Sequence, residues 1–144
     1  MTPSEEFEQQ KLFVNFKQAL ALKEIGFNEY CITSFNARER LVNIFATALE
    51  KDSEIDDCYV KNSQICIKYV TAPTYQQAFS FLRKKYSLES IIPPSGDSGG
   101  KTNGYYYEII FDFSDENIES DTFATYEEAE EACLNKLIEI AKGK

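Results

Sequence analysis

Residues 125–142, TYEEAEEACLNKLIEIAK, carry the strongest structural signal in the chain. Thr125, followed three residues later by Glu128, has the pattern of a capping box, in which a hydroxyl and a carboxylate satisfy backbone N–H groups at the start of a helix. Apolar side chains then recur every three or four residues, and glutamates crowd the first turns, where the helix dipole favours negative charge. The segment therefore predicts an amphipathic helix that ends at Gly143.

The preceding stretch YYYEIIFDF, residues 105–113, alternates between two sets of side chains. Tyr105, Ile109 and Phe113 belong to an almost wholly apolar set, whereas the other set includes Glu108. A period of two among aromatic and β-branched residues is typical of a β-strand. We expect the apolar side of this strand to contact the helices.

Capping residues and apolar periodicity also predict the remaining helices and strands. Further helices are expected at residues 15–25, 36–50 and 74–86, the second of them capped by Asn36 with Glu39. Strands are expected at residues 30–35, 58–61, 64–70, 88–92 and 121–124. Asn62-Ser63 has the spacing of a tight hairpin turn, and the glycine-rich residues 95–104 are expected to form a loop. The sequence thus predicts an α+β fold with an antiparallel sheet of about four to six strands and about four helices.

The helices predicted to start after Asn15, Thr74 and Thr125 begin in the same way. Each has a capping residue, an aromatic residue, two polar residues and an alanine. The likeness fits a divergent tandem repeat of a helix-plus-strands unit, and it also fits the same capping chemistry used three times. We expect a single domain over residues 1–144, with 12–73 and 74–144 as its sub-units if the repeat is real.

The net charge of −9 limits the classes of partner. Nonspecific binding to nucleic acid or to an anionic membrane needs an excess of lysine and arginine, so we expect neither. The sequence has no apolar run long enough to span a membrane, and its N-terminal residues lack the basic and apolar regions of a signal peptide. A cytoplasmic location is the expectation.

Histidine is absent from the chain. This excludes Ser-His and Cys-His catalytic dyads and imidazole ligands for zinc, iron or copper. Cys31, Cys58, Cys66 and Cys133 form no C-x-x-C pair, and we expect buried free thiols without disulfides. We therefore expect no enzymatic activity, no cofactor and no metal. An enzyme with paired carboxylates or Mg²⁺ stays open as an alternative, because acids distant in sequence can meet in space.

The sequence Gly96-Asp97-Ser98-Gly99-Gly100 resembles the motif around the nucleophile of trypsin-like serine proteases. That chemistry needs a histidine to accept the serine proton, and the chain has none. The motif therefore predicts a glycine-rich loop and no protease activity.

The order helix, strands, helix from residue 74 onward resembles the double-stranded-RNA-binding domain. In that family lysines at the start of the last helix bind phosphate, and here the matching positions are Glu127, Glu128, Glu130 and Glu131. The resemblance therefore implies a topology and disfavours RNA binding, since carboxylates repel the phosphate backbone.

A second resemblance involves ALALKEIGF at residues 19–27 with Cys31, TYQQAF at 74–79, and residues 125–140. These segments are similar to a family of small uncharacterised proteins carried by bacteriophages and mobile elements of gut bacteria. The resemblance implies an intracellular accessory role and no catalytic residues.

Acidic side chains are concentrated in residues 105–139, where Lys136 is the only basic residue. We expect a non-enzymatic protein-interaction module, an inhibitor or accessory protein, in which an acidic surface docks the basic surface of an unidentified partner protein. Homo-oligomers stay open. The candidate interaction residues are Asp115, Glu116, Glu119, Asp121, Glu127, Glu128, Glu130 and Glu131.

The alternative function is the binding of a small molecule or nucleotide. In this interpretation the loop at residues 95–104 acts as a lid beside Tyr105, Tyr106 and Tyr107, whose rings stack on a base or sugar.

Overall fold

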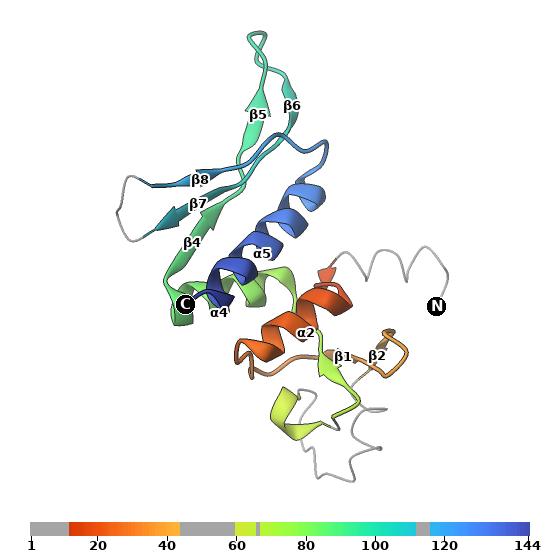
Figure 1. Ribbon diagram of the computed structural model, residues 1–144. Coiled ribbons are helices and arrows are strands. Elements are labelled where there is room, and N and C mark those ends of the chain that lie inside the picture. The colour runs from red at the N-terminus through yellow and green to blue at the C-terminus, as the bar shows by residue number, and fades with distance from the viewer. Residues whose placement is uncertain (1–11, 44–59, 66, 112–115) are drawn as a thin grey trace, which may run out of the picture. The chain divides into compact units, whose positions relative to one another are not determined.

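The computed structural model describes residues 12–43, 60–65, 67–111 and 116–144 (Figure 1). Within these ranges the chain forms three α-helices, one short 3₁₀ helix and eight short β-strands. The chain divides into two compact units, Met1–Gln77 and Ala78–Lys144. The α+β character predicted from the sequence is confirmed. In the described residues, however, the strands form three small antiparallel sheets instead of one larger sheet.

All three α-helices begin at a side-chain cap. In each case the cap oxygen accepts the backbone N–H of the residue three positions later, which satisfies a group that has no partner within the helix. The pairs are Asn15 with Gln18 before α2 (Phe16–Glu24), Thr74 with Gln77 before α4 (Tyr75–Tyr86), and Thr125 with Glu128 before α5 (Tyr126–Lys142). The helices predicted at residues 15–25, 74–86 and 125–142 are therefore confirmed.

Helix α2 places a polar side chain in the interior of the first unit. Gln18 is 2% exposed, and its Oε1 accepts the N–H of Asn15 at 3.0 Å and the hydroxyl of Tyr75 at 3.2 Å. These bonds offset the cost of burying the amide oxygen. The helix ends at Gly26, whose φ of 99° suits a residue without a side chain and allows its N–H to bond to Lys23 O at 3.0 Å.

The helix predicted at residues 36–50 is wrong where the structure describes it. Residues 36–40 form the turn of an antiparallel hairpin between β1 (Thr33–Phe35) and β2 (Leu41–Asn43). Asn36 was expected to cap a helix. Its Oδ1 instead accepts the N–H groups of both Arg38 and Arg40, at 2.9 and 3.1 Å, and so closes a turn. Asparagine side chains can bond to nearby backbone N–H groups in this way, and such bonds compete with helix formation. Residues 44–50 lie outside the described ranges.

The hairpin predicted at Asn62-Ser63 is also wrong. Asn62–Gln64 is a 3₁₀ helix, and Val60 forms a β-bridge with Cys31. Strand β3 (Val70–Thr71) pairs with β1, which gives the sheet order β2-β1-β3. These partners are far apart in sequence, so no local turn signal reports them.

The second unit contains two antiparallel sheets, ordered β4-β7-β8 and β5-β6. Their strands are β4 (Leu88–Ile91), β5 (Pro94–Gly96), β6 (Thr102–Tyr105), β7 (Glu108–Phe111) and β8 (Ile118–Glu119). Because β4 pairs with β7 and β5 pairs with β6, the chain runs out and back as a long interrupted hairpin, seen at the top of Figure 1.

One predicted loop and two predicted strands in this unit differ from the structure. Residues 95–104 are largely the β5-β6 hairpin, closed by Asp97 Oδ1, which accepts the N–H groups of Gly99 and Lys101 at 2.9 Å each. The strand predicted at residues 105–113 is divided between β6 and β7. The edge strand lies at Ile118–Glu119 instead of residues 121–124, where Phe123 forms only a bridge with Tyr105.

Helix α5 covers one side of the β4-β7-β8 sheet. Its buried residues lie on a single stripe: Ala129, Cys133, Leu134, Leu137, Ile138 and Ala141. Ile109 of β7 is fully buried, and α5 contacts β7. The predicted contact between the apolar side of the strand and the last helix therefore exists at Ile109.

Candidate protein-interaction surface

The β4-β7-β8 sheet has a second face, opposite α5, that carries carboxylates and isoleucines. Side chains alternate across a strand, so the neighbours of buried Ile109 point away from the helix. Register places these residues side by side: Glu89 beside Ile110, and Ile91, Glu108 and Glu119 in one row across the three strands. We call these five residues the acidic sheet face.

Glu108 and Glu119 are directly opposite each other in this face. The N–H of Ser120 bonds to Tyr107 O at 2.9 Å, so the next pair along the ladder, Glu108 with Glu119, is of the type that has no backbone hydrogen bonds. Side chains are closest at such pairs, and like charges placed there are destabilising. Asn117 Nδ2 donates to Glu108 Oε1 at 3.0 Å, which compensates one carboxylate in part.

Apolar surface lies next to these charges. Ile91 is 47% exposed and is the cross-strand neighbour of Glu108. On the adjacent row the carboxylate of Glu89 forms a 2.9 Å ion pair with Arg83 of α4, with both side chains about half exposed. An exposed apolar side chain with charged neighbours is the arrangement of a small docking surface.

The four glutamates predicted as interaction residues on the last helix lie in its first turns. Glu127, Glu128 and Glu131 are exposed, whereas Glu130 is half-buried. Because α5 contacts the opposite face of the sheet from Glu108 and Glu119, these glutamates do not belong to the acidic sheet face. The structure thus places the predicted residues in two groups.

Glu130 differs from its neighbours in its surroundings. Burial raises the pKa of its carboxyl, and the nearby Glu127 raises it further, while a hydrogen bond with Tyr126 opposes the change. Burial also raises the pKa of Tyr126, with Glu130 contributing in the same direction. Glu130 therefore takes part in the contacts at the start of α5 more than in an exposed acidic surface.

The remaining predicted residues lie before the helix. Glu119 is in β8 and belongs to the acidic sheet face, and Glu116 and Asp121 are exposed on either side of this strand. Asp115 lies outside the described residues. Glu89, Ile91 and Glu108 were not among the predicted interaction residues, although the alternation in residues 105–113 already separates Glu108 from the apolar side.

The tyrosines of the alternative function are engaged in ring contacts. Tyr105 packs edge-on against Tyr126 with 5.7 Å between ring centroids, and Tyr107 stacks on Phe123 at 6.3 Å. Both side chains are partly buried. A ligand that stacked on these rings would have to displace the present contacts, so this geometry does not favour the nucleotide-binding alternative.

The thiols described by the structure are not suited to nucleophilic chemistry. Cys31 and Cys133 are buried and free, and burial raises their pKa to about 12 and about 11, so both stay protonated near neutral pH. Cys58 and Cys66 lie outside the described ranges. Among the described residues, no group of three acidic or cysteine side chains is arranged to hold a metal ion.

The described helices are also too short or too polar to cross a membrane. Comparisons with protein-family models, with curated proteins and with solved structures yield no significant match.

Proposed function

We infer that the chain is a non-enzymatic protein-interaction module, an accessory or inhibitor protein, whose acidic sheet face docks a basic surface of a partner protein. The observation that supports this most directly is the Glu108–Glu119 pair. Two carboxylates held directly opposite each other, at a pair without backbone hydrogen bonds, are expected to weaken the free protein. Residues that violate a stability rule in this way are common at functional sites, because a partner supplies the missing interaction.

The chemistry of the surface defines the partner. A lysine or arginine placed between Glu108 and Glu119 would meet two carboxylates at once, and an arginine would do so with its planar fork of donors. Ile91 would lose water on contact with an apolar group beside that cation. Exposed ion pairs alone contribute little to affinity. In the complex the affinity therefore comes from Ile91, which becomes buried on docking, and the charges set the orientation of the partner.

The exposed glutamates of α5 have a different part in this proposal. They do not touch the docked partner, and they add to a net charge of −9 that attracts a basic protein over a distance of about 8 Å at physiological salt. Their removal is expected to slow association more than it speeds dissociation.

The setting of the module belongs to the same proposal. The similarity to small phage and mobile-element proteins supports a cytoplasmic accessory role. The helix, strands, helix order of the second unit supports a topology like that of the double-stranded-RNA-binding domain without RNA binding. The shared capping geometry of α2, α4 and α5 supports a divergent repeat, although capping chemistry alone produces the same geometry.

Two double variants with equal net charge test which acidic group binds. A tagged chain is used to isolate the partner from the native host at low salt, and the purified partner is then titrated against Glu108→Gln/Glu119→Gln and Glu127→Gln/Glu128→Gln. We expect the first variant to lose at least about tenfold in affinity and the second to lose about twofold, mainly in association rate.

Equal losses in the two variants, or an affinity that does not depend on salt, would contradict the assignment to the acidic sheet face. Failure to recover any protein that binds the purified wild-type chain would overturn the proposed function as a whole. Circular dichroism of both variants serves as the folding control.

The free protein is expected to gain stability when the repulsion at this pair is removed. Glu119→Gln keeps the shape of the side chain and should raise the free energy of unfolding by about 0.5 kcal/mol in urea titrations at neutral pH and low salt. Glu116→Gln is the matched control, because Glu116 is exposed and lies outside the ladder; it should change stability less. A loss of stability in Glu119→Gln would show that the pair is not repulsive.

A further inference from the structure

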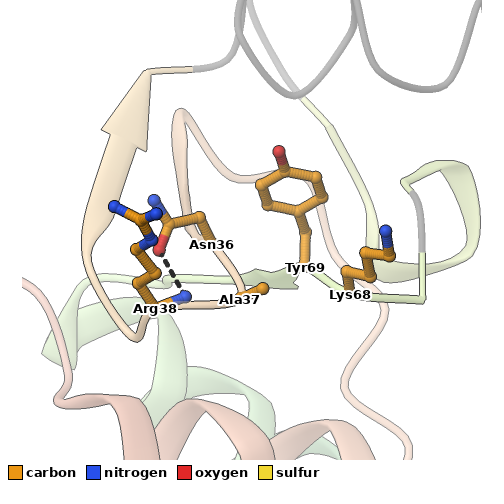
Figure 2. A pocket seen from close by; sticks show the side chains of 5 residues that line it. All are labelled: Asn36, Ala37, Arg38, Lys68 and Tyr69. Carbon is orange, nitrogen blue, oxygen red and sulfur yellow. Dashed lines mark hydrogen bonds between the residues drawn. The ribbon is translucent and has the colours of Figure 1, made fainter.

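A pocket of about 230 Å³ lies in the first unit, next to the turn between β1 and β2. Its lining comes from two segments far apart in sequence: Asn36, Ala37 and Arg38 from the turn, and Lys68 and Tyr69 from the segment before β3. Figure 2 shows the ring of Tyr69 standing between the two groups, with Asn36 and Arg38 on one side and Lys68 on the other.

The turn holds Asn36 in one orientation. Its Oδ1 accepts the N–H groups of Arg38 and Arg40 at 2.9 and 3.1 Å, and its own N–H bonds to Arg40 O at 2.9 Å. Because the amide oxygen faces the turn, the amide nitrogen faces the other way, and Figure 2 shows it beside the guanidinium of Arg38. The turn therefore directs two nitrogen donors to the same side of the pocket.

Two cationic side chains line the pocket, one from each of its two segments. Arg38 and Lys68 are exposed, and among the described residues neither forms an ion pair with a carboxylate. Among the residues that the structure describes, no acidic side chain lines the pocket. The chain has a net charge of −9, whereas the described lining of this pocket carries two cations and an amide. Its chemistry is complementary to an anion.

We propose that this pocket binds a phosphate group, free or carried by a small molecule. Arginine presents paired donors that match two oxygens of a phosphate, the lysine adds a compact charge from the opposite side, and the Asn36 amide donates to a further oxygen. Pockets for drug-sized ligands are larger, about 300–1,000 Å³. The pocket therefore takes the phosphate and leaves the rest of a carrier molecule outside.

The site uses residues of the first unit, so it is independent of the acidic sheet face. A basic pocket and an acidic surface can occur in one protein, because the residues of the pocket and the carboxylates of the acidic sheet face belong to different elements.

Nuclear magnetic resonance of the ¹⁵N-labelled full chain tests the proposal. Inorganic phosphate is titrated to concentrations on the order of 10 mM at constant ionic strength, with chloride as the reference anion. We expect saturable shifts of the backbone amides of Arg38, Lys68 and Tyr69. Adenosine monophosphate should shift the same amides with similar affinity, and adenosine should not.

Three variants with the same change in charge locate the site. Arg38→Gln and Lys68→Gln should each weaken phosphate binding at least about fivefold, whereas Arg40→Gln, on the same turn and outside the lining, should retain it within about twofold. All three side chains are exposed, so thermal stability should stay unchanged. Absence of saturable shifts, or equal weakening by all three variants, would overturn the proposal. Adenosine monophosphate that binds much more tightly than phosphate, with adenosine alone also binding, would show that the pocket recognises the nucleoside instead.

Discussion

Gly104→Ala is expected to lower the free energy of unfolding by about 3 kcal/mol or more. Gly104 is buried in β6 and has a φ of 150°, a conformation that residues with a side chain rarely adopt. A Cβ at this position would overlap Phe123 O and lie 2.6 Å from Thr122 Cγ2. Moving this carbonyl away would break a hydrogen bond, because Phe123 O accepts the N–H of Tyr105 at 2.9 Å.

The damage from this substitution should extend beyond β6. The bridge between Tyr105 and Phe123 positions the segment that enters α5, so its displacement would disturb the contact between Tyr105 and Tyr126. Near-ultraviolet circular dichroism should therefore lose tyrosine signal before the helix signal falls.

Gly96→Ala in the paired strand is the matched control. An added Cβ there would meet only Lys101 O at an ordinary distance of 3.8 Å, and Gly96 does not have a positive φ. Urea unfolding of both variants decides the matter. If Gly104→Ala unfolds within about 1 kcal/mol of Gly96→Ala, the close approach between β6 and residues 122–123 does not exist in solution.

Asn62→Ala is expected to destabilise the first unit by about 3 kcal/mol. The side chain of Asn62 is 9% exposed and joins two distant backbone segments. Its Nδ2 donates to Phe27 O, and its Oδ1 accepts the N–H of Thr71, both at 2.9 Å. Alanine would remove both of these buried hydrogen bonds, at a cost of about 1–3 kcal/mol each before relaxation.

The pH dependence of the stability of Asn62→Asp should distinguish the bond to Phe27 O from the bond to the N–H of Thr71. An ionised aspartate still accepts the N–H of Thr71 but places negative charge against Phe27 O, so burial and the carbonyl raise the pKa of the folded state above that of the unfolded chain. The protonated form can donate to Phe27 O. Stability should therefore rise as pH falls through the pKa of the folded state and level off below about 3.9, the ordinary value of aspartate.

Asn28→Ala is the control for the asparagine variants. Asn28 Oδ1 accepts the N–H of Ser63 at 2.9 Å across the same two segments, but this bond is exposed to water. Its loss should cost well under about 1 kcal/mol. Equal destabilisation by Asn28→Ala and Asn62→Ala would show that burial of Asn62 is not what makes its bonds important.

The starts of the α-helices were predictable because their determinants are local. The cap oxygens of Asn15, Thr74 and Thr125 bond within four residues of themselves, so the relevant distances exist as soon as the helix forms. The same reasoning was wrong at Asn36. Its side chain can cap a helix or close a turn, and pairing of Phe35 with Leu41 and Val70 decides between them.

The candidate site was predictable only in part. Alternation in residues 105–113 separates Glu108 from Ile109, and the burial of Ile109 confirms that separation. No local sequence pattern predicts that Ile91 and Glu119 lie beside Glu108, because the register depends on which strands pair. The acidic stretch 127–131 was visible in the sequence, yet the sheet lies between it and the acidic sheet face.

Local sequence patterns were enough to predict the α+β class, the starts of the three described α-helices, the apolar side of β7 and the acidic character of residues 105–139. These properties follow from composition and from spacings of two to four residues. Tertiary structure alone decided the strand register, the role of Asn62 and the convergence of Arg38 with Lys68. Such contacts join residues far apart in the chain, and they form because burial of Val70 in the first unit, and of Leu88 and Ile109 in the second, selects one strand pairing among many.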